Sequence, residues 1–229
     1  MRDHFRNIYQ HRAADYDALV AREDYQGNLA RALAEVRPWP GLDVVEPGAG
    51  TGRLTRLLAP DARSVVALDI APAMLRVARA SLDADSRVTF AVADNGALPL
   101  RDAVADLAVA GWSLGHSVAW FPNTWRGVIG TALAEMRRVL RPGGTVVILE
   151  TLGTGRETPA PPTDELAAYY RWLEDQHGFH RTWLRTDYRF ASLDEAEQLT
   201  RFFFGDDLAD RVRREGLGTL PECTGMWWF

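Results

Sequence analysis

The sequence contains no lysine, because all 26 of its basic residues are arginine. Without lysine, the chain cannot form a Schiff base with a carbonyl substrate or coenzyme, and it lacks the lysine of a phosphate-binding loop. Two large classes of enzyme are therefore excluded before any pattern is considered.

Cysteine is almost as scarce, since Cys223 is the only one in 229 residues. A single cysteine can form no internal disulfide, and it offers no thiolate cluster for zinc or an iron–sulfur centre. His177 and His180 lie three residues apart with Asp175 nearby, but Gly178 interrupts the helix that would have to present them. We therefore predict a protein of a reducing compartment without a bound metal.

Positive charge is in deficit, with 31 acidic residues against 26 basic ones and a formal net charge of −5. No overall positive field can neutralise a nucleic-acid backbone, so no nucleic-acid partner is expected. No run approaches the roughly 18 apolar residues of a membrane span, and residues 1–9 lack the apolar stretch of a signal peptide. The expectation is a complete cytoplasmic chain that does not associate with membranes, as a monomer or a homodimer.

Short β-branched runs alternate with helical patterns in the first two thirds of the chain. Apolar residues make up 47% of the sequence, enough to bury a sizeable core. This alternation is typical of βαβ units with a mainly parallel sheet. The predicted strands are 42–46, 64–69, 88–93, 107–110 and 145–150.

A stretch rich in glycine, threonine and proline at 153–162 breaks this alternation. Beyond it, apolar and aromatic residues at helical spacing predict a helix over 166–173. Strict alternation at 182–190 predicts a strand with one buried and one wet face, either antiparallel or at an edge. A capping box at 192–195 predicts the start of a helix, and 219–229 is predicted as a last strand.

A glycine-rich turn, Glu46-Pro47-Gly48-Ala49-Gly50-Thr51-Gly52, joins the first strand to a helical pattern. Glycine permits positive φ and close approach of a ligand, and the following helix amino terminus favours a carboxylate or phosphate. The dinucleotide fingerprint G-x-G-x-x-G requires glycine at position 53, which is Arg53 here. The spacing argues against nicotinamide and flavin dinucleotides and leaves other nucleotide ligands open.

Acidic residues end the next two strands. Asp69 closes the second strand, where a carboxylate in such folds accepts hydrogen bonds from ribose hydroxyls. Asp94 and Asn95 follow the third strand and lie beside the crevice where open α/β sheets bind ligands. Each of these groups has a structural alternative, as a tight turn or a helix cap. Their shared order favours a site for a nucleoside with free hydroxyls.

With these motifs the chain resembles the class I S-adenosylmethionine-dependent methyltransferases, specifically the small-molecule branch typified by the methyltransferase-11 domain. The resemblance covers residues 9–151. It is carried by 44–53, Asp69, Asp94 and the turn at 140–144, and by 12–17, which is similar to the family's amino-terminal cofactor-lid segment.

The resemblance implies a Rossmann-like α/β fold with a mainly parallel seven-stranded sheet, helices on both faces and a substrate-covering insertion. It implies a single domain, 1–229, with a helical lid at 1–40, a cofactor-binding core at 41–152 and an insertion or lid at 153–178. The remaining residues, 179–229, would supply strands and a helix that complete the sheet.

S-adenosylmethionine is the cofactor that the resemblance implies. The glycine turn would hold its methionine part, Asp69 its ribose and Asp94 its adenine amino group, while Ile70 would flank the adenine ring. The cofactor-binding residues implied in this way are Tyr16, Glu46, Gly48, Ala49, Gly50, Gly52, Asp69, Ile70, Asp94, Asn95, Gly111 and Trp112.

Methyl transfer from a sulfonium is a direct displacement, so the protein mainly aligns the acceptor and excludes water. The segment 111–116, which would face the methyl group, departs from the Asn/Asp-Pro-Pro-aromatic motif of many enzymes that methylate nucleic acids or proteins. A small organic acceptor is therefore expected. His116 is the candidate general base, because an unperturbed histidine has a pKa of about 6.5. A hydrogen-bonding or capping role is the alternative for this residue.

The sequence leaves two other functions open. A non-catalytic S-adenosylmethionine-binding protein would carry the same cofactor motifs. A nicotinamide-dependent oxidoreductase is disfavoured by Gly52 and Arg53, which do not match the dinucleotide spacing.

Overall fold

The computed structural model describes residues 2–82 and 87–229. They form a seven-stranded sheet of order β3-β2-β1-β4-β5-β9-β6. The strands are β1 (Asp43–Pro47), β2 (Ser64–Asp69), β3 (Val88–Val92), β4 (Ala105–Gly111), β5 (Leu140–Thr154), β6 (His180–Arg185) and β9 (Glu222–Trp228). All neighbours pair in parallel except β9, which is antiparallel to both β5 and β6. The predicted α/β fold with a mainly parallel seven-stranded sheet is confirmed.

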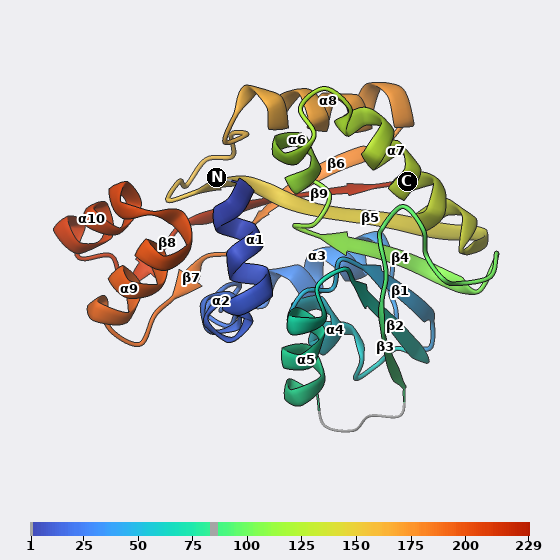
Figure 1. Cartoon of the computed structure of the whole chain (residues 1–229), viewed down its shortest axis with the longest axis horizontal. Helices are drawn as coiled ribbons and strands as arrows, with labels where there is room; N and C mark the ends of the chain where they lie inside the picture. The colour runs from blue at the N-terminus through green and yellow to red at the C-terminus, as the bar shows by residue number, and fades with distance from the viewer. Residues whose placement is uncertain (1, 83–86) are drawn as a thin grey trace.

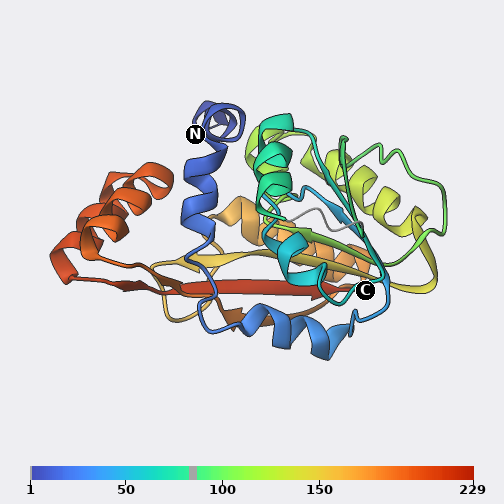
Figure 2. The same cartoon turned by 90° about the horizontal axis from the view of Figure 1, so that it is seen from below.

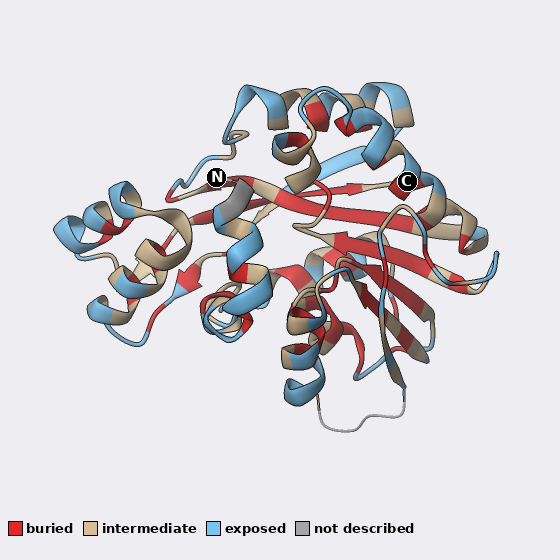
Figure 3. Ribbon diagram, viewed as in Figure 1, coloured by how far each residue is buried: buried red, intermediate tan, exposed pale blue. Residues whose placement is uncertain are grey.

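The central strands are apolar along their length because both faces of the sheet are covered. Residues 107–110 of β4 and 146–149 of β5 are almost fully inaccessible to solvent. Figure 3 shows the buried residues concentrated in the sheet, while the outer surfaces of the helices are exposed. Continuous apolar runs thus specify the position of each central strand.

Helices cover both faces of the sheet (Figure 1). On one face lie α3 (Asn28–Val36), α4 (Arg53–Leu58) and α5 (Pro72–Ser81), and on the other lie α6 (His116–Trp120), α7 (Trp125–Arg138) and α8 (Asp164–His177). Leu33 and Leu58 belong to the core of the first face, and Ile129 and Trp227 to that of the second. These helices fix the loops that follow the strands.

The structure differs from the predicted insertion at 153–178. Residues Asp164–His177 form α8, whose Tyr169, Tyr170 and Leu173 are fully buried in the core. The Tyr170 ring stacks on Trp227 of β9 with ring centroids 4.5 Å apart. The aromatic face of this helix therefore covers the sheet, and α8 is a core helix.

The elements added to the sheet lie instead between β6 and β9. They are β7 (Tyr188–Arg189), α9 (Leu193–Phe204), α10 (Asp206–Glu215) and β8 (Thr219–Leu220). The predicted strand 182–190 is divided into β6 and β7 at Asp187, whose carboxylate accepts hydrogen bonds from Arg185 and from the Glu222 backbone. This unit has its own small apolar core and projects from one end of the sheet (Figure 2).

The amino-terminal helices α1 (Arg2–His11) and α2 (Ala13–Val20) lie between this unit and the carboxyl ends of the parallel strands (Figures 1 and 2). Phe203 of α9 contacts Phe5 and Tyr16, with ring centroids 5.2 and 5.4 Å away. Of the predicted helical lid at 1–40, α1 and α2 adjoin the site described below, whereas α3 packs on the sheet.

Every helix within residues 2–82 and 87–229 is too short or too polar to span a bilayer. The same residues contain no group of three or more histidine, cysteine, aspartate or glutamate side chains placed to hold a metal ion.

Candidate functional site

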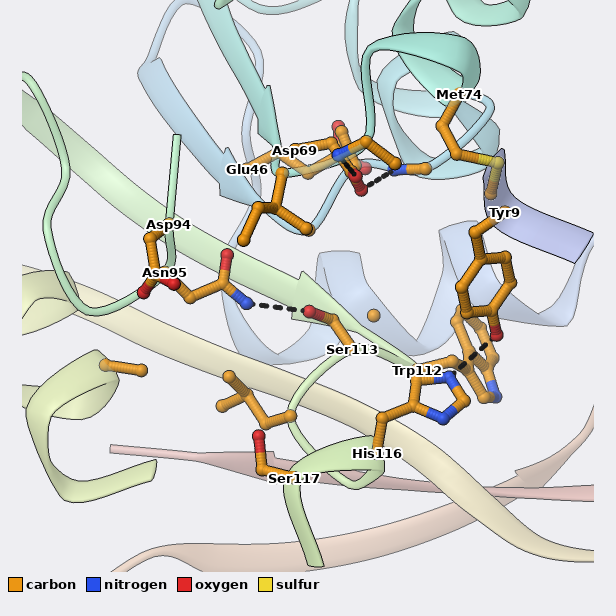
Figure 4. A pocket seen from close by; sticks show the side chains of 18 of the residues that line it. Tyr9, Glu46, Asp69, Met74, Asp94, Asn95, Trp112, Ser113, His116 and Ser117 are labelled. Carbon is orange, nitrogen blue, oxygen red and sulfur yellow. Dashed lines mark hydrogen bonds between the residues drawn. The ribbon is translucent and has the colours of Figure 1, made fainter. Parts of the chain in front are cut away.

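A pocket of about 600 Å³ opens where β1, β2, β3 and β4 end. All the predicted site residues except Gly52 line it, although they come from six separate segments between positions 16 and 116. Figure 4 shows Asp69 and Glu46 on one side of this pocket and Tyr9 and His116 on another. The strand ends and the amino-terminal helices therefore enclose one space.

Gly52 has a different role from the one predicted. It precedes α4 with φ 85°, and a Cβ atom there would come within 3.0 Å of the Ala78 side chain. The missing side chain allows α4 and α5 to pack closely. Gly52 thus permits the packing of α4 against α5 and does not line the pocket.

The glycine turn exposes backbone atoms to the pocket, because Gly48 and Gly50 have no side chains to cover them. Gly48 and Gly50 have φ values of 70° and 57°, in the left-handed region that side chains disfavour. A Cβ atom on Gly48 would overlap the side chain of Ser113. Glycine is therefore required at position 48 by both conformation and space.

Asp69 is oriented by two backbone groups. Its Oδ2 accepts a hydrogen bond from Gly50 N at 2.9 Å, and its Oδ1 accepts one from Ala71 N at 2.7 Å. Burial raises the pKa of this carboxyl, and the two backbone hydrogen bonds oppose the rise. Each carboxylate oxygen has two lone pairs, so each can still accept from a hydroxyl in the pocket.

Ile70 follows directly and presents an apolar surface to the pocket. The residue is 65% exposed, which is unusual for a large aliphatic residue. Such a surface suits the face of a flat, weakly polar ring.

Asp94 and Asn95 form a tight turn after β3. The Asp94 carboxylate accepts from Gly96 N at 2.7 Å. The Asn95 amide donates to the Ser113 hydroxyl at 2.9 Å, which links this turn to the loop after β4 (Figure 4). The two strand ends are thus held together across the pocket.

Glu46 is a buried acid with one short hydrogen bond, in which the Thr55 hydroxyl donates to its Oε2 at 2.5 Å. Burial raises the pKa of Glu46 to about 8, opposed by Thr55 and by the positive charges of Arg56 and Arg53. Glu46 is therefore mostly protonated at neutral pH, and a cation entering the pocket would favour its ionised form.

Gly111 and Trp112 bring the end of β4 against the glycine turn. A Cβ atom on Gly111 would lie 2.7 Å from Leu54, so only glycine fits there without rearrangement. Trp112 has φ 49° and donates its backbone N–H to Leu149 O at 2.6 Å. The guanidinium of Arg53 stacks on the Trp112 ring, 3.3 Å from its centre. Trp112 thus has a left-handed backbone conformation, a hydrogen bond to β5 and a ring contact with Arg53.

His116 is the first residue of α6, and its Nε2 lies 2.8 Å from the hydroxyl of Tyr9. Burial lowers the pKa of His116 to about 4 and raises that of Tyr9 well above its usual range, so both groups are neutral at pH 7. Tyr9 donates when the imidazole proton is on Nδ1 and accepts when it is on Nε2. A neutral imidazole can accept a proton, and the hydroxyl of Tyr9 provides a path for one.

Glu150 of β5 binds the backbone directly before His116. Glu150 Oε1 accepts a hydrogen bond from Gly115 N at 2.7 Å. Burial raises the pKa of Glu150 to about 8, opposed by its backbone hydrogen bonds. The position of His116 thus depends on a buried acid from a neighbouring strand.

Three residues that line the pocket are not predicted by the sequence: Tyr9, Arg53 and Trp120. Ser113, which also lines it, belongs to the segment 111–116 expected to face the methyl group. Tyr9 and Tyr16 lie on separate helices, α1 and α2, so the seven-residue spacing between them does not describe one helix face and gave no valid signal for Tyr9. The two rings contact each other with centroids 5.5 Å apart. No sequence signal pairs Tyr9 with His116, because 107 residues separate them.

The chain is similar to known proteins. A family model described as a methyltransferase domain matches residues 45–148. The malonyl-[acyl-carrier protein] O-methyltransferase of Geobacter sulfurreducens is 37% identical over 193 residues, covering 81% of this chain and 67% of that protein. The ubiquinone/menaquinone biosynthesis C-methyltransferase of Acidiphilium cryptum is 36% identical over 149 residues, covering 59% and 56%. The chain thus spans between about half and two thirds of the length of these curated relatives.

Solved structures share the fold. A SAM-dependent methyltransferase from Aquifex aeolicus aligns with a TM-score of 0.54 at 16% identity, over 89% of this chain and 93% of its own. The YcgJ protein of Bacillus subtilis aligns with a TM-score of 0.60 at 13% identity, over 88% and 97%. Because the Geobacter relative shares 37% identity across two thirds of its length, this chain belongs to the class I S-adenosylmethionine-dependent methyltransferases.

Proposed function

We propose that this chain transfers the methyl group of S-adenosylmethionine to a small-molecule acceptor by direct displacement. One observation carries the proposal. A single pocket has the glycine turn and Asp69 on one side and the neutral His116–Tyr9 pair on another. A cofactor and an acceptor bound in that space would meet away from bulk water.

The residues of the pocket fit the cofactor of the family. Asp69 retains lone pairs for ribose hydroxyls, Ile70 offers an apolar face for adenine, and the backbone at Gly48 and Gly50 is open to close approach. Asp94 and Asn95 also line the pocket. When bound, S-adenosylmethionine supplies a methyl group on a positively charged sulfur, which leaves the alignment of the acceptor to the protein.

The His116–Tyr9 pair indicates an acceptor that loses a proton. The relatives named above divide between O-methylation of malonyl-[acyl-carrier protein] and C-methylation in quinone biosynthesis. An acceptor that is already anionic needs only orientation, whereas a hydroxyl or carbon acid benefits from a neutral imidazole within reach. We therefore favour a hydroxyl or carbon acid, with His116 as the base and Tyr9 as its hydrogen-bond partner.

We also propose that α1 and α2 form the lid over this pocket, since Tyr9 and Tyr16 line it from those helices. The absence of a nucleic-acid partner, a cytoplasmic location and a monomeric or homodimeric state stay predictions.

Isothermal titration with S-adenosylmethionine, S-adenosylhomocysteine and NADH tests the cofactor, with Asp69→Ala as the control. We expect binding of the first two ligands, weakened in the variant, and none of NADH. An acceptor screen for S-adenosylhomocysteine release then separates an enzyme from a protein that only binds the cofactor. Binding of NADH alone would contradict the proposal.

A further inference from the structure

Arg53 occupies a position that its role as the first residue of α4 does not explain. Its side chain is 16% exposed and lines the pocket directly after the glycine turn. Its guanidinium stacks on Trp112, and its Nη1 donates to Glu23, whose side chain is 2% exposed. The positive charge is thus held at one place by two neighbours.

Arg53 differs from the other arginines around the pocket. Arg6 and Arg76 also line it, but both are exposed residues on α1 and α5. The charged residues that line the pocket in and directly beside the glycine turn are otherwise acids, Glu46 and Asp69, since Arg56 donates to Thr51 O but is outside the lining. Among the lining residues that the structure describes, Arg53 is therefore the arginine whose side chain is largely buried.

The Arg53 guanidinium has N–H donors that its ion pair with Glu23 does not use. Its ion pair with Glu23 uses Nη1, and its Nε and Nη2 have no hydrogen-bond acceptor within residues 2–82 and 87–229. A guanidinium presents its donors in a planar fork that matches a carboxylate, and stacking on an aromatic ring leaves the edge of that fork free. Arg53 can therefore bind a second carboxylate without leaving the first.

We propose that Arg53 selects the cofactor through its α-carboxylate, with Trp112 and Glu23 as the positioning residues that hold the guanidinium. This inference rests on the proposed function. The sulfonium and the ammonium of S-adenosylmethionine are positive, so the carboxylate is the group of its amino-acid end that an arginine attracts. Glu46, an acid that also lines the pocket, suits the ammonium instead.

Trp112 supports this assignment by its backbone. Bulky residues rarely adopt positive φ, and such outliers cluster where the surrounding structure requires them. Trp112 has φ 49°, and its ring lies against the Arg53 guanidinium, with the ring centre 3.3 Å from the guanidinium carbon. The conformation is explained if the ring serves as a platform for the guanidinium.

The test compares S-adenosylmethionine with its decarboxylated analogue, which keeps the sulfonium and the amine. Isothermal titration measures the ratio of the two affinities in the wild-type protein and in the Arg53→Met variant. We expect the wild type to favour S-adenosylmethionine by about 10- to 100-fold, as for a charge-assisted hydrogen bond. In Arg53→Met the preference disappears, while affinity for the decarboxylated analogue is retained.

Arg56 provides a control on the same helix. It pairs with Asp17 at 3.0 Å and donates to Thr51 O at 2.8 Å, but its side chain is outside the lining of the pocket. Because both ligands keep the sulfonium and the amine, the Arg56→Met variant should change the two affinities alike and keep the wild-type ratio. A ratio that falls equally in both variants would overturn the proposal, because any charge lost from α4 would then have the same effect.

Loss of Arg53 leaves Glu23 buried without its partner, which can unfold the protein. The double variant Arg53→Met/Glu23→Gln removes both charges, and Glu23→Gln alone keeps Arg53. We expect the single variant to retain the preference for the carboxylate and the folded double variant to lose it. A folded double variant that still prefers S-adenosylmethionine would refute the proposed role of Arg53 and leave the proposed function of the chain intact. A wild-type protein that binds neither ligand would instead refute the proposed function.

Discussion

The buried Glu150 makes the stability of this protein depend on pH. Glu150 lies in β5 and is 4% exposed, and its carboxylate accepts a hydrogen bond from Gly115 N. Burial raises its pKa from 4.5 to about 8, and the electrostatic influence of Glu150 extends to Tyr169 and Tyr170. A folded-state pKa above the unfolded value means that its contribution to stability is full below pH 4.5 and is lost as pH rises through 8.

The size of the effect follows from the two pKa values. At about 1.4 kcal/mol per pKa unit, the change from 4.5 to about 8 corresponds to about 5 kcal/mol between low and high pH. Glutamine at position 150 keeps an oxygen acceptor for Gly115 N and cannot ionise. The Glu150→Gln variant should therefore gain stability relative to the wild type as pH rises from 5 to 8.5.

Urea unfolding followed by circular dichroism at several pH values measures this difference directly. Glu46 and Glu222 also have pKa values raised to about 8, but they titrate in both proteins and cancel in the comparison. Glu165→Gln is the control, because the pKa of that exposed acid is lowered and its variant should show no change above pH 5. A stability difference for Glu150→Gln that is independent of pH would refute the reasoning.

Three further predictions concern the pocket and its frame. Asp69→Ala should weaken S-adenosylmethionine affinity by about tenfold or more in titration calorimetry, since it removes a charged acceptor, while the circular dichroism spectrum stays native; unchanged affinity would place Asp69 outside the cofactor site. His116→Asn should lower turnover by about 10²- to 10⁴-fold with little change in cofactor affinity, and wild-type kcat/KM should rise with pH through about 4 as the imidazole loses its proton; full activity in the variant would leave His116 a structural residue. Gly52→Ala should lower the free energy of unfolding by about 1–3 kcal/mol, because φ is 85° and the new Cβ would crowd Ala78; a urea midpoint equal to that of the wild type would show that α4 and α5 can separate at little cost.

The strands and the turn after β1 could be predicted because their signals are local. A parallel strand covered on both faces needs a continuous apolar run, so β2 was predicted over its full length at 64–69. The glycines at 48 and 50 are visible in the sequence because few other residues adopt their backbone conformation. Each of these features is specified within a few residues.

The insertion was misplaced because apolar spacing identifies a buried helix face without naming what covers it. Tyr169 and Tyr170 are as consistent with a lid as with a core helix until β9 is placed beside them. The division of 182–190 into β6 and β7 has the same origin, since Asp187 is held by the backbone of Glu222 from a distant segment. Partners of this kind depend on the topology of the whole sheet.

The sequence alone determined the α/β class, the order of the central strands along the chain and the acids that end them, because these follow from periodicity and from residues suited to one backbone conformation. Only the tertiary structure decided which groups meet in the pocket. It placed Tyr9 against His116 and Arg53 between Glu23 and Trp112. The physical reason is that burial and long-range contact set the charge state and the direction of these side chains, and neither can be read from neighbours in the chain.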